Sequence, residues 1–227
     1  MVARPQRVIV FDAYGTLFDV GGITAACEAV FPGHGEVLSR AWREKQLRYT
    51  WLRALMGRYE DFERVTEDAL LAACRDLGLD PEVARERGLA EGYTRLPAYP
   101  DVPAALQALE RAGFRLVILS NGTPAQLGAL VARAKLGASL EILSADAVRT
   151  YKPDPRVYRL VTDRFGVAAA EVLFVSSNAW DVAGALSFGF LCAWLNRAGT
   201  AFEVLGHEPA LTIRSLAELP DRIVGRA

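Results

Sequence analysis

The chain has 227 residues, of which 52% are hydrophobic and 23% charged, and 26 basic against 27 acidic side chains leave a formal net charge of −1. This composition is typical of a globular protein, and the length suits one large domain or a core with a smaller inserted unit. The balanced charge gives no electrostatic reason to expect nucleic acid or an anionic membrane as a partner. The three cysteines lie far apart without metal-ligand spacing, which favours a reducing compartment.

The N-terminal segment Met1–Phe11 contains two arginines and then a short apolar run that ends at Asp12. A signal peptide needs a longer apolar stretch, so this run is predicted to be the first core strand. No other run approaches the roughly 20 apolar residues of a membrane span. These features predict a cytoplasmic protein.

A helical block is predicted between the first strand and a proline-rich segment. From about Ile23 to Tyr93, apolar residues recur with helical periodicity. The predicted helices are Glu36–Met56, Asp61–Leu77 and a third that begins at Asp80-Pro81, where an N-cap residue precedes proline at the first helical position. Leu96–Pro100 contains two prolines and is predicted to be a linker.

Helices and strands alternate after Asp101. The predicted helices are Asp101–Ala112, Pro124–Lys135, Pro155–Phe165 and Ala179–Phe188, and the predicted strands are Arg7–Phe11, Arg115–Ser120, Glu141–Leu143, Glu171–Val175 and Leu191–Trp194. This alternation predicts an α/β fold in which helices flank both faces of a parallel sheet. The predicted domains are an α/β core, residues 1–17 and 97–227, and an all-helical subdomain inserted after the first strand, residues 18–96.

Polar residues follow four of the predicted strands. They are Asp12, the pair Ser120-Asn121, the pair Tyr151-Lys152 and the run Ser176–Asp181. Sites in open parallel sheets form beyond the carboxyl ends of the strands, so these residues are expected to meet. Turn formation explains each of them alone equally well. Together they supply two carboxylates, a lysine and several amides, which indicates a functional site.

Asp12 is the candidate nucleophile of this site. An isolated aspartate after a strand is most simply a turn or cap residue, but here Gly15 and Thr16 follow it and Lys152 can pair with its charge. A carboxylate can act as a nucleophile and form an ester intermediate. Lys152 is one of three lysines in the chain and precedes a segment stiffened by two prolines, although a surface lysine is the alternative at this point.

Four motifs resemble those of the haloacid dehalogenase superfamily. They are Asp12-Ala13-Tyr14-Gly15-Thr16-Leu17-Phe18-Asp19, Ser120-Asn121-Gly122-Thr123, Tyr151-Lys152-Pro153-Asp154-Pro155 and Ser176-Ser177-Asn178-Ala179-Trp180-Asp181. The segment Ala41–Arg53 resembles the cap helix of the L-2-haloacid dehalogenase branch, with Arg43 matching an arginine of that branch. The resemblance implies a Rossmann-like core with a helical cap, a hydrolase acting on carbon–halide bonds, and a homodimer.

Two departures from the superfamily pattern indicate the branch. Phosphatases place a second aspartate, a general acid and base, two residues after the nucleophile, where this chain has Tyr14. Their fourth motif usually carries an aspartate that helps to hold magnesium, where this chain has Ser177. Without these carboxylates a hard cation loses ligands and a phosphate leaving group loses its proton donor. The resemblance therefore implies an enzyme with no cofactor and no metal.

The resemblance implies a two-step reaction between a short-chain L-2-haloacid and water. Asp12 displaces the halide from C2 with inversion and forms an ester. Water activated by Asp181 then attacks the Asp12 carbonyl carbon, which releases a D-2-hydroxy acid. Lys152 is expected to keep Asp12 ionised and oriented. The other catalytic candidates, expected to orient these groups through hydrogen bonds, are Thr16, Ser176 and Asn178.

Further residues are implied in binding the substrate and the halide. Arg43, the Asn121 amide and the positive edge of the Trp180 ring are expected to hold the departing halide. Backbone amides near Tyr14 and at Ser120-Asn121 are expected to hold the substrate carboxylate. Tyr158 either matches a polar residue of the family site or packs a helix. Leu47 and Phe62 either join Tyr14 and Trp180 in an apolar wall around the alkyl chain of the substrate or belong to the core.

Two other functions stay open from the sequence, a phosphatase acting on an unknown phosphate ester and a non-catalytic protein of the same fold, because a fold alone does not determine function. Tyr14 and Ser177 argue against the phosphatase, and the complete set of polar residues argues against the non-catalytic protein. His34 and His207 fall outside every motif and are expected at the surface or in loops.

Overall fold

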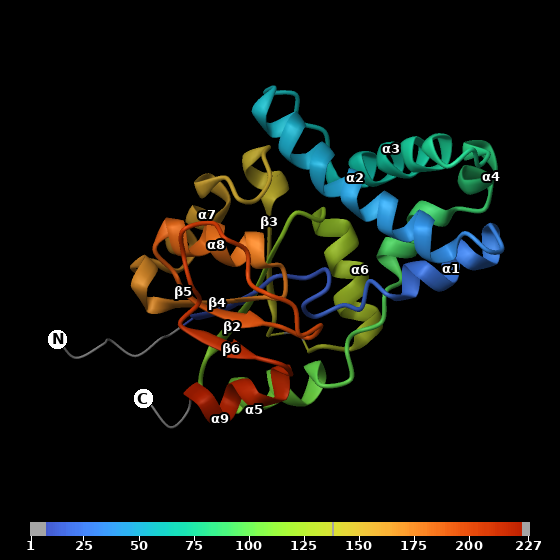
Figure 1. Ribbon diagram of the computed structural model, residues 1–227. Coiled ribbons are helices and arrows are strands. Elements are labelled where there is room, and N and C mark those ends of the chain that lie inside the picture. Colours follow the sequence, from blue (N-terminus) through green and yellow to red (C-terminus); the bar gives the residue numbers. More distant parts are fainter. Residues whose placement is uncertain (1–7, 138, 224–227) are drawn as a thin grey trace.

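In a computed structural model, which describes residues 8–137 and 139–223, helices cover both faces of a six-stranded sheet (Figure 1). All strand pairs are parallel, in the order β3-β2-β1-β4-β5-β6. The strands are β1 (Val8–Phe11), β2 (Arg115–Ser120), β3 (Glu141–Ser144), β4 (Val172–Ser176), β5 (Leu191–Leu195) and β6 (Leu211–Ile213). The predicted α/β fold is therefore confirmed. Residues 1–7, including the predicted strand residue Arg7, lie outside the described part of the chain.

Each helix for which the sequence predicted both ends begins and ends within one residue of the prediction. The helices are α1 (Gly22–Val30), α2 (Gly35–Leu55), α3 (Phe62–Asp76), α4 (Pro81–Glu86), α5 (Val102–Arg111), α6 (Pro124–Ala134), α7 (Pro155–Phe165), α8 (Ala179–Phe188) and α9 (Leu219–Ile223), with 3₁₀ turns η1 (Leu89–Thr94), η2 (Ala145–Val148), η3 (Ala169–Glu171) and η4 (Leu216–Glu218). Capping explains this agreement, because the side chains of Asp61, Thr123 and Asp154 accept hydrogen bonds from the first turns of α3, α6 and α7.

The sequence does not predict the C-terminal elements β6 and α9. β6 consists of three residues, Leu211-Thr212-Ile213, paired with Ala193–Leu195 of β5. A run this short has no periodicity that could identify it as a strand. Its place in the sheet depends on pairing with β5, which is a tertiary interaction.

The alternation of side chains along the strands separates two core layers. In β1, Val8 and Val10 pack into the layer that contains α7 and α8, whereas Ile9 and Phe11 pack into the layer that contains α5 and α6. This second layer continues without a break into the helical block, for example to Trp42 of α2. Because the buried side chains form one cluster across both parts, the predicted domain boundaries near residues 17 and 97 stay a prediction.

Two adjacent chain segments connect the helical block, α1 to η1, with the sheet. The Asp19 N–H donates to the Pro97 carbonyl at 2.8 Å, and the Tyr99 N–H donates to the Leu17 carbonyl at 2.9 Å. In Figure 1 the block lies to one side of the sheet, with the long α2 running above α6 and toward η2 and α7. This placement brings α2 over the carboxyl end of β1, because that strand leads directly into the connection.

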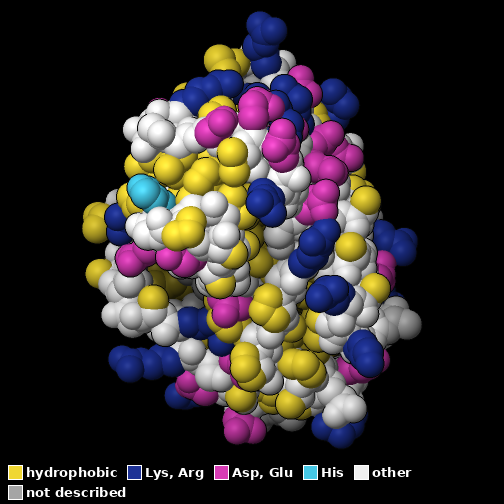
Figure 2. Space-filling model, turned by 90° about the vertical axis from the view of Figure 1, so that its right-hand side faces the viewer, with side chains coloured by type: hydrophobic (Ala, Val, Ile, Leu, Met, Phe, Trp, Pro, Cys, Tyr) yellow, Lys and Arg dark blue, Asp and Glu magenta, His cyan; other side chains and the backbone are white. Residues whose placement is uncertain are grey.

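The surface agrees with the balanced composition. On the face drawn in Figure 2, Lys and Arg side chains lie among Asp and Glu side chains and scattered hydrophobic ones. Within residues 8–137 and 139–223, no helix combines the length and the apolar character needed to cross a bilayer.

Gly184 in α8 allows the segment before α7 to approach closely. A Cβ at this position would lie 2.5 Å from Pro153 Cβ and 2.6 Å from the Tyr158 hydroxyl oxygen. We therefore expect Gly184→Ala to lower the free energy of unfolding by about 1–3 kcal/mol through overpacking. Gly128→Ala in α6, where a Cβ would meet no atom within 4 Å, is the matched control and should raise it by about 0.5–1 kcal/mol. Urea unfolding followed by circular dichroism measures the free energy of unfolding of both variants. A higher value for Gly184→Ala as well as for Gly128→Ala would contradict the packing argument.

Candidate active site

Asp12 lies directly after β1, which is flanked in the sheet by β2 and β4. Its backbone N–H donates to the Val175 carbonyl at 3.0 Å, which extends the β1–β4 pairing by one residue beyond Phe11. The side chain is only 8% exposed. The sheet therefore holds a buried carboxylate at the edge where β2 and β4 also end.

Among the described residues, four side chains donate hydrogen bonds to the Asp12 carboxylate. Lys152 Nζ lies 3.1 Å from Oδ1. Asn178 Nδ2, Thr16 Oγ1 and Ser176 Oγ lie 2.8, 3.2 and 3.5 Å from Oδ2. The structure thus brings the predicted partners of Asp12 together from the loop after β1, the segment before α7 and the connection from β4 to α8.

Lys152 lies between the buried carboxylates of Asp12 and Asp181. Its Nζ is 3.1 Å from Asp12 Oδ1 and 2.7 Å from Asp181 Oδ2, and its side chain is 1% exposed. Burial lowers the pKa of Lys152, but the charges of Asp12 and Asp181 outweigh that effect, so the net shift of this pKa is upward. The lysine therefore stays charged and compensates the carboxylates on either side.

Asp181, in the first turn of α8, is fully buried. Burial raises the pKa of Asp181 to about 6; the charge of Lys152 opposes this rise and the charge of Asp12 adds to it. The Tyr158 hydroxyl donates to Asp181 Oδ1 at 2.8 Å, so both carboxylate oxygens carry a hydrogen bond. A carboxyl group with this pKa is ionised at neutral pH and can accept a proton.

Tyr158 lies behind Asp181. Its ring packs against Phe174, Phe188 and Phe190 at centroid distances of 5.9 to 6.0 Å, and the side chain is fully buried. This agrees with the helix-packing alternative, and the hydroxyl reaches the site through Asp181. The predicted contact of Tyr158 with substrate stays a prediction.

Asn121 follows β2 and has a fixed side-chain orientation. Its Oδ1 accepts the Lys152 backbone N–H at 3.0 Å. Because the oxygen is engaged there, the two N–H donors of the amide point away from that bond. Ser120, the last residue of β2, is buried, and its Oγ accepts the Gly122 N–H at 3.3 Å.

The loops after β1 and β4 touch each other at Thr16 and Ser177. The Ser177 N–H donates to Thr16 Oγ1 at 2.8 Å, and the Asn178 amide donates to the Tyr14 carbonyl at 3.2 Å. Gly15 has a φ of +84°, which favours glycine, and a Cβ there would lie 3.2 Å from Ser177 Oγ. Ser177 therefore serves in this chain to join the two loops.

Arg43 of α2 lies near the loop after β1. Its charge acts on the hydroxyl groups of Tyr14 and Tyr93, and the charge of Asp12 also acts on Tyr14. Burial raises the pKa of the Tyr14 hydroxyl, which therefore keeps its proton at neutral pH. Tyr14 thus lies within electrostatic reach of both Arg43 and Asp12.

Two residues that the sequence analysis missed lie beside Arg43. Gln46 accepts a hydrogen bond from Arg43 Nη1 at 2.7 Å, and the charge of Arg43 acts on the hydroxyl group of the buried Tyr93. The spacing of three residues along one helix could have indicated Gln46. No local signal indicates Tyr93, which comes from η1.

The predicted apolar wall falls into two groups. The Tyr14 ring lies 5.4 Å from the Phe62 ring, and Leu47 is half-buried one helical turn after Arg43 on α2. Trp180 instead meets Trp51 of α2 edge to face, with ring centroids 5.5 Å apart. The structure therefore brings Tyr14 and Phe62 together and pairs Trp180 with a residue that was not predicted.

The histidines stand apart from the site. His34 and His207 are both exposed, as expected. Across the described ranges, no group of three or more His, Cys, Asp or Glu side chains is arranged to hold a metal ion.

Comparisons with known proteins agree with this geometry. Residues 6–189 match the family model of haloacid dehalogenase-like hydrolases. The (S)-2-haloacid dehalogenase of Pseudomonas sp. (strain YL) is 46% identical over 223 residues, 96% of each chain. The (S)-2-haloacid dehalogenase of Xanthobacter autotrophicus is 50% identical over 192 residues, 84% of this chain and 75% of that protein.

A solved structure extends the similarity to three dimensions. The L-2-haloacid dehalogenase from Xanthobacter autotrophicus with chloropropionic acid covalently bound superposes with a TM-score of 0.91 at 42% identity, covering 97% of this chain and 99% of that chain. The fold, the motifs and the matched length lead to one conclusion: this chain belongs to the haloacid dehalogenase-like hydrolases.

Proposed function

We propose that this chain is an (S)-2-haloacid dehalogenase, which hydrolyses short-chain L-2-haloacids to D-2-hydroxy acids and releases halide. The observation that carries the proposal is the buried Asp12 carboxylate, held by Lys152 and Asn178 at the end of β1. The similarity to (S)-2-haloacid dehalogenases over 96% of the chain supports it, and so does the related structure with chloropropionic acid covalently bound.

In the first step, a carboxylate oxygen of Asp12 attacks C2 from the side opposite the halogen. The new C–O bond forms while the carbon–halogen bond breaks, and its electron pair leaves with the halide. Arg43, the amide hydrogens of Asn121 and the edge of the Trp180 ring stabilise the negative charge on the halide. Inversion at C2 converts the L-haloacid into the ester of a D-hydroxy acid. Backbone amides near Tyr14 and at Ser120-Asn121 hold the substrate carboxylate.

In the second step, Asp181 takes a proton from water, and the water oxygen attacks the Cγ atom of Asp12. The bond between Cγ and the former Asp12 oxygen breaks, and this oxygen leaves on the product and takes the proton back from Asp181, which gives the hydroxyl group of the product and restores the ionised Asp181. Lys152 contacts both carboxylates, so it orients Asp12 and Asp181 during these transfers. Thr16 and Ser176 fix the loop geometry around them.

A phosphatase is not favoured. At the position of the usual second aspartate, the buried Tyr14 hydroxyl keeps its proton. Ser177 stands where an aspartate would help to hold magnesium, and its backbone joins the loop at Thr16. We therefore propose that the reaction needs no metal and no cofactor.

The helical residues 18–96 are proposed to act as a cap over the core formed by residues 1–17 and 97–227, since α2 delivers Arg43 to the site. A cytoplasmic homodimer is also proposed. In support, Leu52 and Met56 at the end of α2 are 45% and 61% exposed, and exposed apolar patches commonly mark protein contacts.

Asp12→Asn is expected to lower turnover by several orders of magnitude without loss of fold, because an amide is a far weaker nucleophile than a carboxylate. The effect is measured as halide release from L-2-chloropropionate, with and without EDTA. D-2-chloropropionate is a parallel sample. Asp19→Asn is the matched control, since this half-buried carboxylate accepts the Gly21 N–H and, among the described residues, makes no hydrogen bond within the group around Asp12. Full activity of Asp12→Asn would contradict the proposal, as would halide release that EDTA abolishes.

The rate of ester hydrolysis should fall as pH drops through the pKa of Asp181, because only the ionised carboxylate accepts a proton from water. The charge of Asp12 contributes to the raised pKa of Asp181, which is about 6. Esterification removes that charge, so the fall of the hydrolysis rate at acid pH, the acid limb of the pH–rate profile, should lie below pH 6. The Tyr158 hydrogen bond lowers the pKa of Asp181. Tyr158→Phe, which keeps the ring packing, should therefore move the limb to higher pH.

Rapid-quench mass spectrometry of the acyl-enzyme across pH 4–8 measures this rate in both proteins. A limb that stays in place or moves to lower pH in Tyr158→Phe would show that Asp181 does not act as the base.

A further inference from the structure

A buried series of hydrogen bonds connects Arg43 of α2 with the backbone of α3. Arg43 Nη1 donates to Gln46 Oε1 at 2.7 Å, and Gln46 Nε2 donates to Thr66 Oγ1 at 2.7 Å. The Thr66 hydroxyl in turn donates to the Phe62 carbonyl at 2.6 Å. Gln46 is fully buried and Thr66 is 1% exposed, so water does not compete for these bonds.

The direction of each bond in this series is fixed, because a guanidinium group has donors and no acceptor. Gln46 must present its carbonyl oxygen to Arg43, which leaves the NH₂ group of the amide facing Thr66. The single hydroxyl proton of Thr66 goes to the Phe62 carbonyl, so the hydroxyl oxygen accepts from Gln46. Only one orientation of the Gln46 amide therefore satisfies all of its partners.

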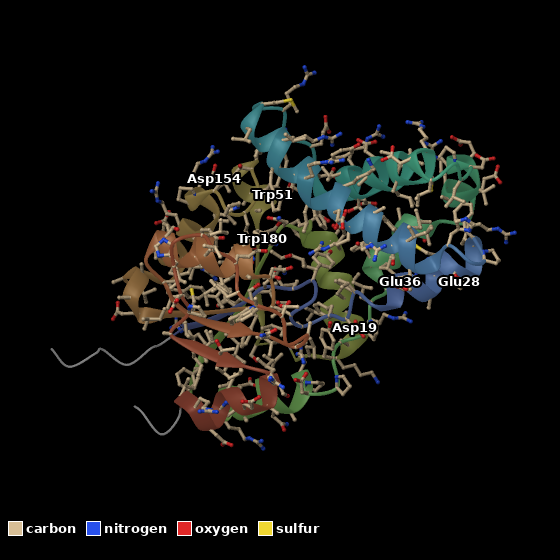
Figure 3. The ribbon with its side chains drawn as sticks, in the orientation of Figure 1. Asp19, Glu28, Glu36, Trp51, Asp154 and Trp180 are labelled. Carbon is tan, nitrogen blue, oxygen red and sulfur yellow. The ribbon has the colours of Figure 1, made fainter. Side chains whose placement is uncertain are left out.

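Thr66 is itself held firmly against α2. The Trp42 indole N–H donates to the Thr66 carbonyl at 2.8 Å, so Thr66 binds α2 through its backbone as well as its side chain. Trp42 is fully buried, and its ring meets the Tyr93 ring edge to face with centroids 5.0 Å apart. In Figure 3, the labels Glu36 and Trp51 lie near the two ends of α2, and the residues of this series belong to the helix between them. Thr66 is therefore a fixed point on α3 beside the middle of α2.

Gln46 holds Arg43 without cancelling its charge. Within the described ranges, the ion pairs of α2 involve Arg40, Lys45 and Arg53, and no carboxylate pairs with Arg43. A carboxylate partner would offset the positive charge, whereas the neutral amide leaves that charge available to an anion. The long arginine side chain loses rotamer freedom through this bond, which fixes where its remaining donors lie.

We propose that Gln46 and Thr66 are positioning residues for halide departure, which act through Arg43. The inference rests on the proposed function, because Arg43 must meet the halide that Asp12 displaces. Removal of either side chain should slow formation of the ester, the step in which charge develops on the halide. Hydrolysis of the ester should not change, because no charge develops on the halide in that step. A residue that only supports the fold would not separate the two steps.

Three variants test the series. Gln46→Met keeps the length of the side chain but removes both hydrogen bonds, and should slow ester formation about 10- to 100-fold, the effect of losing a hydrogen bond to a charged group. Thr66→Val keeps the shape but leaves the Gln46 amide without its acceptor, and should slow ester formation about tenfold. Thr66→Ser retains the hydroxyl group and should restore the rate to within about twofold of the original.

Thr50→Val is the matched control for Thr66→Val. Thr50 is also buried in the helical block, and its hydroxyl donates to a carbonyl of its own helix, that of Leu47, at 2.6 Å. Thr50 takes no part in the series of bonds to Arg43, so neither step should change.

Single turnovers of L-2-bromopropionate measure both steps, because bromide release reports ester formation and rapid-quench mass spectrometry reports the decay of the ester on Asp12. Circular dichroism checks that each variant is folded. If Gln46→Met does not fold, the comparison of Thr66→Val with Thr66→Ser decides the question.

The expected result is slower ester formation in Gln46→Met and Thr66→Val with unchanged ester decay, and recovery in Thr66→Ser. Equal slowing of both steps, a loss in Thr50→Val as large as in Thr66→Val, or no change in any variant would overturn the positioning role and leave the proposed function intact. If the unaltered protein forms no ester and releases no bromide, the proposed function fails and the positioning role with it.

Discussion

The ion pairs of Lys152 with Asp12 and Asp181 are the interaction on which the rest of the site depends. All three side chains are almost wholly buried, and an uncompensated buried charge destabilises a protein by several kcal/mol. The lysine must therefore be placed accurately. Asn121 binds its backbone N–H, and the ring of Phe174 lies 4.9 Å from its Nζ. The missing side chain at Gly184 lets Pro153 approach α8, which keeps the lysine between the two acids.

The surroundings of the two carboxylates differ, and this difference separates their proposed roles. Asp12 accepts hydrogen bonds from the loops after β1 and β4, which orient it at the strand end. Asp181 lies deeper, where burial raises its pKa to about 6 and Tyr158 supports the ionised form. Asp12 and Asp181 carry the same chemical group, but their surroundings differ. One can therefore act as nucleophile in the first step and the other as base in the second.

The sequence predicted the fold well where local signals are strong. The bounds of β2 and α7 agree with prediction because β-branched runs, proline and the capping residue Asp154 are all local features. The site was predictable as a set of strand ends, which the structure gathers around Asp12. The contact of Lys152 with Asp181 and the position of Tyr158 behind that acid were not predictable, because they depend on distances between elements far apart in the chain. The three-residue strand β6 was missed for the same reason.

The ester on Asp12 is the central claim, and a single turnover in H₂¹⁸O tests it most directly. With protein in excess over L-2-chloropropionate, the account predicts that the lactate formed contains ordinary oxygen, since its hydroxyl oxygen comes from the Asp12 carboxylate. Mass spectrometry of the peptide containing Asp12 should then show one ¹⁸O atom. Labelled lactate with an unlabelled Asp12 peptide would mean that water attacks C2 directly, and would contradict the account.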